Sequence, residues 1–217
     1  MNPPMKRHKT LTEFQREEMG QIIKDTLQDD YAKLELYQLN IKEDAIEQIT
    51  EIDCRIVVNG KKMTIKGKGR GPVDALFTAL VNKLSKDYHS LEKLSFARFS
   101  VEADINKDLD TAKTDGAVHA TLEIDHELDS LLFREWANSV SIVSAKVVLS
   151  TIEHFVNAEK AVVKLYEGLQ HARKSGRGDM INVYTQQLTG IVKNVSYEKV
   201  IERLKNESRK NTAPQYS

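Results

Sequence analysis

The chain has 217 residues, with 32 basic side chains balanced by 32 acidic ones and a single cysteine. One cysteine excludes an intramolecular disulfide framework and a cysteine zinc site. The length excludes a (β/α)₈ enzyme barrel, which needs about 250 residues. No apolar run approaches the ~18 residues of a membrane span, and the first residues lack the apolar core of a secretory signal. We therefore expect a cytoplasmic protein without a membrane partner.

Residues 1–34 are predicted to form an N-terminal helical extension. Thr12 and Gln15 have the spacing of a capping box, and apolar residues follow at helical spacing. Asp29 and Asp30 are expected to end this helix.

After this helix the hydrophobic period changes to two. Alternating apolar residues, including Tyr37, predict strands over 37–41 and 52–58. Asn59-Gly60 is a strong hairpin signal and predicts a third strand over 62–66.

A glycine-rich connection, Gly67–Gly71, then leads into a helix predicted over 73–84. Pro72 suits the first turn of this helix, and Asp74 lies near the positive end of the helix dipole. The connection admits two interpretations. Its backbone N–H groups could bind a carboxylate or phosphate, or its glycines could serve only a tight strand-to-helix connection. It is neither a P-loop nor a dinucleotide fingerprint.

The same order of elements then recurs. Alternation and helical spacing predict three further strands and a helix at residues 99–105, 118–124, 131–133 and 140–155. Two βββα units, 35–88 and 91–158, therefore form an internal duplication. A single unit leaves the apolar face of its sheet uncovered. We expect an α+β domain over 35–158 in which two pseudo-symmetric units pack together.

The remaining residues are predicted to be a C-terminal helical extension over 159–212, with a disordered tail over 213–217. Apolar stripes at 162–169, 181–191 and 197–204 each need a partner surface. The N-terminal helix, the sheet or another subunit could supply that surface.

Five positive charges lie between Lys61 and Arg70. They could form a nucleic-acid or anion patch, but aromatic side chains for base stacking are missing nearby. Alternation places Lys62, Lys66 and Lys68 on one strand face, which favours a solvated face. Nucleic acid is therefore a disfavoured partner.

No residue pattern indicates catalysis. The six histidines have no metal-binding spacing, and the acidic stretch 104–115 lacks the pattern of an EF-hand. Cys54 lies on an apolar strand face and is expected to be buried. We predict no catalytic residue, no metal site and no cofactor.

The segment Gly67–Leu80, GKGRGPVDALFTAL, resembles the C-terminal regulatory domain of α-isopropylmalate synthase and citramalate synthase. That family has a Gly-x-Gly-Pro-Val-Asp-Ala-Leu segment at the start of the first helix of two βββα units. The resemblance extends from about Leu36 to Phe155. The segments Phe99–Ala103 and Ser144–Ile152 support it.

The resemblance implies a dimeric, non-catalytic domain that binds leucine or isoleucine and regulates a synthase of branched-chain amino-acid biosynthesis. Carried over by position, Gly69, Arg70 and Gly71 would bind the ligand carboxylate through backbone N–H groups. The apolar part of the pocket would be formed by Val73, Leu76, Phe99 and Ala112. In the second unit the matching connection, Glu135–Ser139, has no glycine.

Two functions follow from the resemblance. The first is a free-standing homodimeric regulatory module that binds an amino acid and acts on a separate synthase catalytic protein. The second is a dimerisation or protein-interaction scaffold that has lost the ligand. An anion- or nucleic-acid-binding protein is the third hypothesis, and an enzyme is the weakest.

Overall fold

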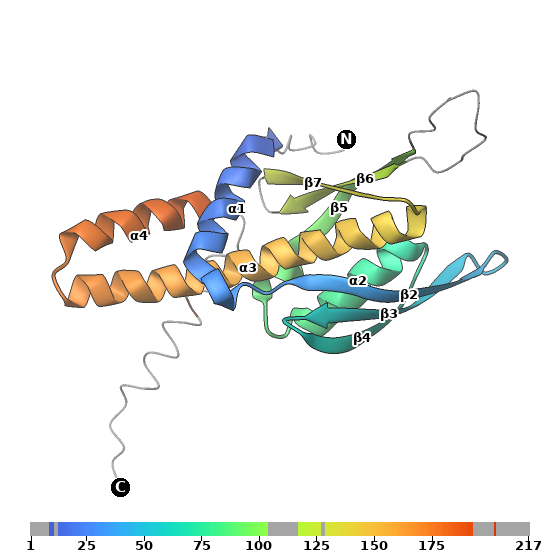
Figure 1. The fold of residues 1–217 in the computed structure, drawn as a ribbon, viewed down its shortest axis with the longest axis horizontal. Helices are drawn as coiled ribbons and strands as arrows, with labels where there is room; N and C mark the ends of the chain where they lie inside the picture. Colours follow the sequence, from blue (N-terminus) through green and yellow to red (C-terminus); the bar gives the residue numbers. More distant parts are fainter. Residues whose placement is uncertain (1–8, 11–12, 104–116, 127–128, 193–201, 203–217) are drawn as a thin grey trace, which may run out of the picture.

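The computed structural model describes residues 9–10, 13–103, 117–126, 129–192 and 202. In chain order (Figure 1) the elements are β1 (Lys9–Thr10), α1 (Glu13–Leu27), η1 (Gln28–Asp30), β2 (Leu34–Asp44), β3 (Ile49–Val58), β4 (Lys61–Gly69), α2 (Pro72–Leu84), η2 (His89–Lys93), β5 (Leu94–Ala103), β6 (Val118–His126), β7 (Asp129–Ala137), α3 (Val140–Lys174) and α4 (Gly178–Ile191). Each unit has three antiparallel strands followed by a helix, which confirms the predicted α+β class with two βββα units, and β1 adds a parallel strand to the second sheet.

The first unit forms the sheet β2-β3-β4. Asn59 and Gly60 form its predicted hairpin, and both have positive φ, 49° and 77°, as a tight turn between twisted strands requires. The expectation that Tyr37 shares a face with Leu39 is wrong. A bulge at Tyr37 shifts the register between Leu36 and Gln38, so Leu36 faces the core and Tyr37 is 59% exposed.

The second unit repeats this register in the sheet β1-β7-β6-β5. Its first strand has a bulge at the corresponding place, between Phe96 and Arg98. The row Leu39, Cys54 and Ile65 across the first sheet corresponds to Phe99, Leu122 and Phe133 across the second. The predicted third strand is too short, because β7 continues to Ala137.

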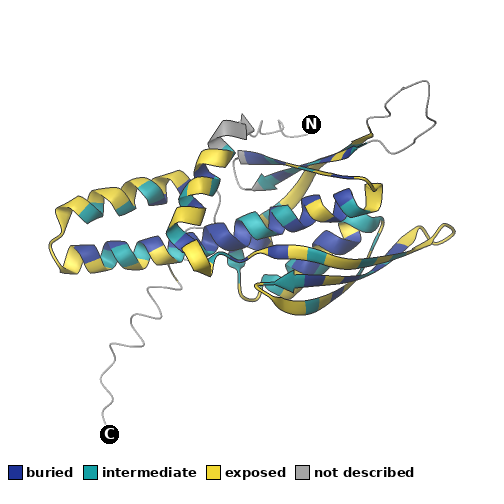
Figure 2. Ribbon diagram, viewed as in Figure 1, coloured by how far each residue is buried: buried dark blue, intermediate teal, exposed yellow. Residues whose placement is uncertain are grey.

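The helices α2 and α3 lie between the two sheets, as Figure 1 shows for α3. Helix α2 packs on β4 and β3, whereas α3 packs on β7, β6 and β2. The inner faces of both sheets therefore share one core with both helices, and the buried residues concentrate there (Figure 2). This shared core explains why the units are paired, since each sheet has one apolar face to cover.

Helix α3 continues far beyond the second unit, so the predicted domain limit at residue 158 lies inside this 35-residue helix. The turn after α3, where Gly176 has φ 66°, leads into α4. Helix α1 packs against both α3 and α4 (Figure 1). The N-terminal helix thus supplies part of the partner surface for the first two C-terminal stripes. The third predicted stripe, 197–204, lies outside the described residues apart from Glu202.

Candidate functional site

The glycines at the end of β4 allow a close approach to α2. A Cβ atom on Gly67 would lie 2.5 Å from the carbonyl oxygen of Ala75, and one on Gly69 would lie 2.6 Å from the Ala75 nitrogen. Both glycines belong to the strand rather than to a loop, which corrects the predicted connection. The tight strand-to-helix interpretation therefore accounts for Gly67 and Gly69, whereas a Cβ on Gly71 would meet no neighbour.

An acidic residue in the first turn of α2 binds the backbone just before the helix. The backbone N–H of Arg70 donates a 2.9 Å hydrogen bond to Oδ2 of Asp74, and the carbonyl of Gly71 accepts one from Ala75. Pro72 is the first helical residue, as predicted. The Arg70 N–H, expected to bind a ligand carboxylate, is thus already occupied by a carboxylate of the chain.

The remaining residues of the predicted pocket lie on α2 and β5. Leu76 is buried in the shared core, Val73 is half-buried, and Phe99 is 38% exposed on the inner face of β5. A contact links the two elements, because the rings of Phe77 and Phe96 have centroids 4.3 Å apart. The structure therefore places the Val73 helix and the Phe99 strand in contact, while Ala112 lies outside the described residues.

The second unit differs at the positions that match the first. Gly67 pairs with Ile52 in the first sheet, and at the corresponding position of the second sheet Glu135 pairs with Ala120. A glycine that lets a helix approach is thus replaced by a charged residue. The strand-to-helix connection therefore differs chemically between the two units.

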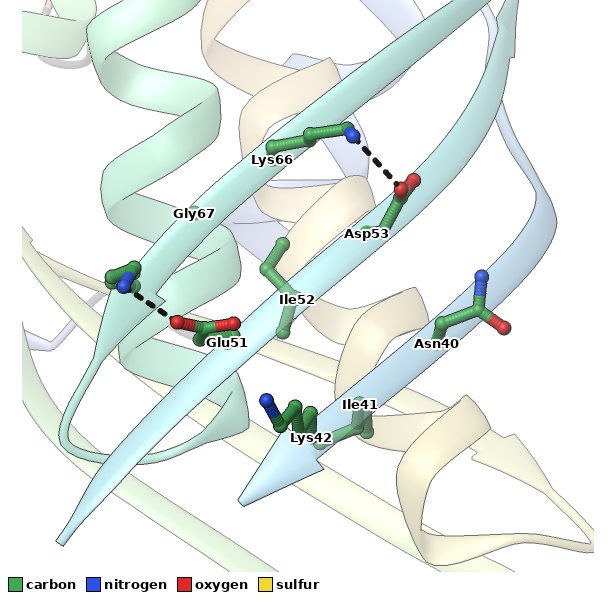
Figure 3. Close-up of a pocket in the computed structure, with 9 residues that line it drawn as sticks. Asn40, Ile41, Lys42, Glu51, Ile52, Asp53, Lys66 and Gly67 are labelled. Carbon is green, nitrogen blue, oxygen red and sulfur yellow. Dashed lines mark ion pairs between the residues drawn. The ribbon is translucent and has the colours of Figure 1, made fainter. Parts of the chain in front are cut away.

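The outer face of the first sheet has a groove of about 600 Å³ across all three strands (Figure 3). Two of its lysines form ion pairs: the Lys66 Nζ lies 3.3 Å from Oδ2 of Asp53, and the Lys68 Nζ lies 2.5 Å from Oε1 of Glu51. The hydrogen bond and charge of Lys68 lower the pKa of Glu51. These two pairs neutralise most of the positive charge in the groove, which supports a solvated, ion-paired face over a nucleic-acid patch.

Cys54 is fully buried, as predicted, and burial raises the pKa of its thiol to about 11. A thiol in this state is a packing group rather than a nucleophile. Within the described residues, no group of three or more His, Cys, Asp or Glu side chains is placed to hold a metal ion. The acidic stretch 104–115 lies outside that part of the chain.

A known protein family matches more than half of the chain. The sequence model described as the LeuA allosteric (dimerisation) domain matches residues 13–153. The chain belongs to the LeuA allosteric domain family. The match confirms the resemblance seen at Gly67–Leu80, and it includes α1. None of the curated proteins compared with the sequence matches it.

The LeuA domain match ends at residue 153, within α3, but the core continues beyond it. Phe155, Val162 and Leu165 are buried, as are Leu188 and Ile191 of α4.

No helix among the described residues is long and apolar enough to cross a membrane.

The sequence interpretation missed a set of buried and half-buried polar side chains on α3. Glu153 accepts hydrogen bonds from the Tyr31 hydroxyl at 2.9 Å and the Leu34 N–H at 2.7 Å. Burial raises the pKa of Glu153, and burial together with the charge of Glu153 raises the pKa of Tyr31. Further along, Glu159 accepts a 2.8 Å bond from the Ser90 N–H. The sequence carries a signal for these side chains, namely polar residues that stand at helical spacing within an apolar stretch.

Proposed function

We propose that this chain is a non-catalytic, homodimeric regulatory module that binds leucine or isoleucine and acts on a separate synthase of branched-chain amino-acid biosynthesis. The observation that carries the proposal is membership of the LeuA allosteric (dimerisation) domain family over residues 13–153. The paired βββα architecture supports it, since both units of the family pattern are present.

The proposed dimer surface is the open edge of the second sheet. Strand β5 is the last strand of that sheet, and its inner face exposes Phe96 and Phe99 by 37% and 38%. Two large aromatic side chains that are partly exposed at a sheet edge favour association, because their burial removes apolar area from water.

The proposed ligand site lies beside this surface, where the first turns of α2 meet β5. Val73 and Phe99 supply apolar contacts for a branched side chain, and Gly71 leaves open space at the start of the helix. The positive end of the α2 dipole favours the ligand carboxylate. Since Asp74 occupies the Arg70 N–H, a bound carboxylate has to use other donors or displace Asp74.

Calorimetry and sedimentation test the two parts separately. Titration of the full chain with leucine, isoleucine and valine is expected to show binding of leucine or isoleucine, and Phe99→Ser is expected to weaken it at least tenfold. Sedimentation is expected to show a dimer that Phe96→Ser weakens. Val183→Ser, at a 46% exposed apolar position on α4, is the matched control. A monomeric wild type contradicts the dimer.

A second function, a dimerisation scaffold without a ligand, is favoured by one observation. Glu135 stands where the first unit has Gly67, and the Arg70 N–H is bonded internally. A wild-type dimer that binds none of the three amino acids at millimolar concentration supports this scaffold and rejects the sensor. Co-purification with a synthase catalytic protein then distinguishes a regulatory partner from an isolated dimer.

A further inference from the structure

A second cavity lies between α1, β7 and α3, at a different place from the junction of α2 with β5. Its volume is about 420 Å³, and Arg16, Gly20, Phe133, Glu153 and His154 are among its lining residues. This volume falls in the lower part of the range of about 300–1,000 Å³ for small-molecule sites. Ile23 and Phe133, both buried, give it an apolar part beside charged groups of both signs.

Arg16 has a donor without an acceptor in this cavity. Its guanidinium lies 5.6 Å from the centroid of the Phe133 ring. Its Nε atom is buried and has no hydrogen-bond partner among the described residues. A buried, charged donor without an acceptor is costly, and a carboxylate is the acceptor that matches a guanidinium best.

Glu153 provides an acceptor in the same cavity. The Tyr31 hydroxyl and the Leu34 N–H occupy one site on each of its oxygens. A carboxylate has about four acceptor sites, so Glu153 retains capacity for a donor on a ligand. Asn157 holds the neighbouring wall by bonds to both backbone groups of Ala32. The acceptor is therefore held in place before any ligand binds.

Gly20 leaves space where a side chain would fit. It lies inside α1, and a Cβ atom there would meet no neighbour within 4 Å. A glycine within a helix lowers stability relative to alanine. Packing does not require this glycine, so its effect at the cavity wall is to leave volume free.

We propose that this cavity binds a small carboxylic acid that carries a second, hydrogen-bond-donating group, as an α-hydroxy or α-amino acid does. The carboxylate binds Arg16 and the second group donates to Glu153. The site is separate from the proposed leucine site at Val73 and Phe99, and it does not depend on that proposal.

Three probes of one carbon skeleton test this site in the full chain. Propionate, lactate and alanine differ only in the group at the second carbon, so thermal unfolding in each isolates the effect of the donor. Lactate or alanine at millimolar concentration is expected to raise Tm by about 2 °C or more, and propionate by less.

Variants test whether the rise in Tm comes from binding in this cavity. Arg16→Gln removes the proposed anchor, and Gly20→Leu fills the space, so both are expected to abolish the rise in Tm. Arg55→Gln, at an exposed position of β3, is the control and is expected to keep it. An unchanged Tm of the wild type with all three probes, or a rise that persists in Arg16→Gln, overturns the proposal. Phe99→Ser is expected to retain this response, which separates it from leucine binding.

Discussion

Asn157 of α3 holds both backbone groups of Ala32: its Oδ1 accepts from the Ala32 N–H at 2.7 Å, and its Nδ2 donates to the Ala32 carbonyl at 2.8 Å. Both residues are buried. This pair fixes the segment that enters the first strand of the first unit to a helix of the second unit. Ser90, at the entry to the first strand of the second unit, is held by Glu159 of the same helix.

Replacement of the amide should therefore destabilise the fold. Asn157→Ala leaves the N–H and the carbonyl of Ala32 buried without partners, at about 1–3 kcal/mol each. We expect the free energy of unfolding in urea to fall by about 3–5 kcal/mol. Asn82→Ala, at an exposed position on α2, is expected to change it by less than about 0.5 kcal/mol. Equal effects of the two variants would contradict the role of the pair.

The carboxyl of Glu153 should make stability depend on pH. Burial raises its pKa above the ordinary 4.5, so the folded state holds this proton more tightly than the unfolded state. The contribution of Glu153 to stability is fully present below pH 4.5 and is lost as pH rises through the folded pKa.

Glu153→Gln removes this titration, so the stability of the variant should fall less over that interval than the stability of the wild type. Urea unfolding across the acidic to neutral range measures the difference. Glu167→Gln, at an exposed position on α3, serves as the control. Parallel pH curves for wild type and Glu153→Gln would show that another group is responsible.

The closeness of β4 to α2 predicts a sharp contrast between two glycines. Gly67→Ala places a Cβ atom 2.5 Å from the carbonyl oxygen of Ala75, so strand and helix have to separate. We expect a loss of about 3 kcal/mol. Gly71→Ala introduces no contact, and its φ of −165° suits any residue, so its stability should stay within about 0.5 kcal/mol. A stable Gly67→Ala variant would contradict the close approach.

The part of α3 beyond residue 153 should be essential to stability although the family match ends there. Leu165 is 3% exposed within the core, and its truncation to alanine is expected to cost about 2–5 kcal/mol. Val183→Ala on α4, 46% exposed, is expected to cost far less. Guanidinium unfolding compares the two, and a chain that ends at residue 153 is expected not to fold cooperatively.

The order of the elements was predictable because strands and helices have different hydrophobic periods. The hairpin at Asn59-Gly60 and the start of α2 at Pro72 carried local signals as well. The bulge at Tyr37 carried none, because a bulge adds a residue without a characteristic side chain. The predicted C-terminal ends of β4 and β7 also lie too early in the chain. The residues that extend these strands include glycines in β4 and charged residues in β7, and neither type is typical of strands.

The candidate sites depend on contacts distant in sequence. The resemblance placed Val73 and Phe99 in one pocket, and the contact of Phe77 with Phe96 joins their elements. The bond from the Arg70 N–H to Asp74 was not foreseen, although the four-residue spacing allowed it. The cavity of Arg16 and Glu153 could not be predicted, because it forms only when α1 lies against β7 and α3.

The edge strands differ in the assemblies that they permit. β4 is the last strand of its sheet and has lysine at positions 61, 62, 66 and 68, and charge on an edge opposes the addition of another strand. At the far edge of the other sheet, β5 has only Arg98 and Glu102 as charged residues. This difference in edge charge favours β5 over β4 as the strand that forms the proposed dimer. In the proposed dimer, an antiparallel pair of β5 strands would use the same edge in both chains, so growth would end at two copies instead of continuing into a fibre.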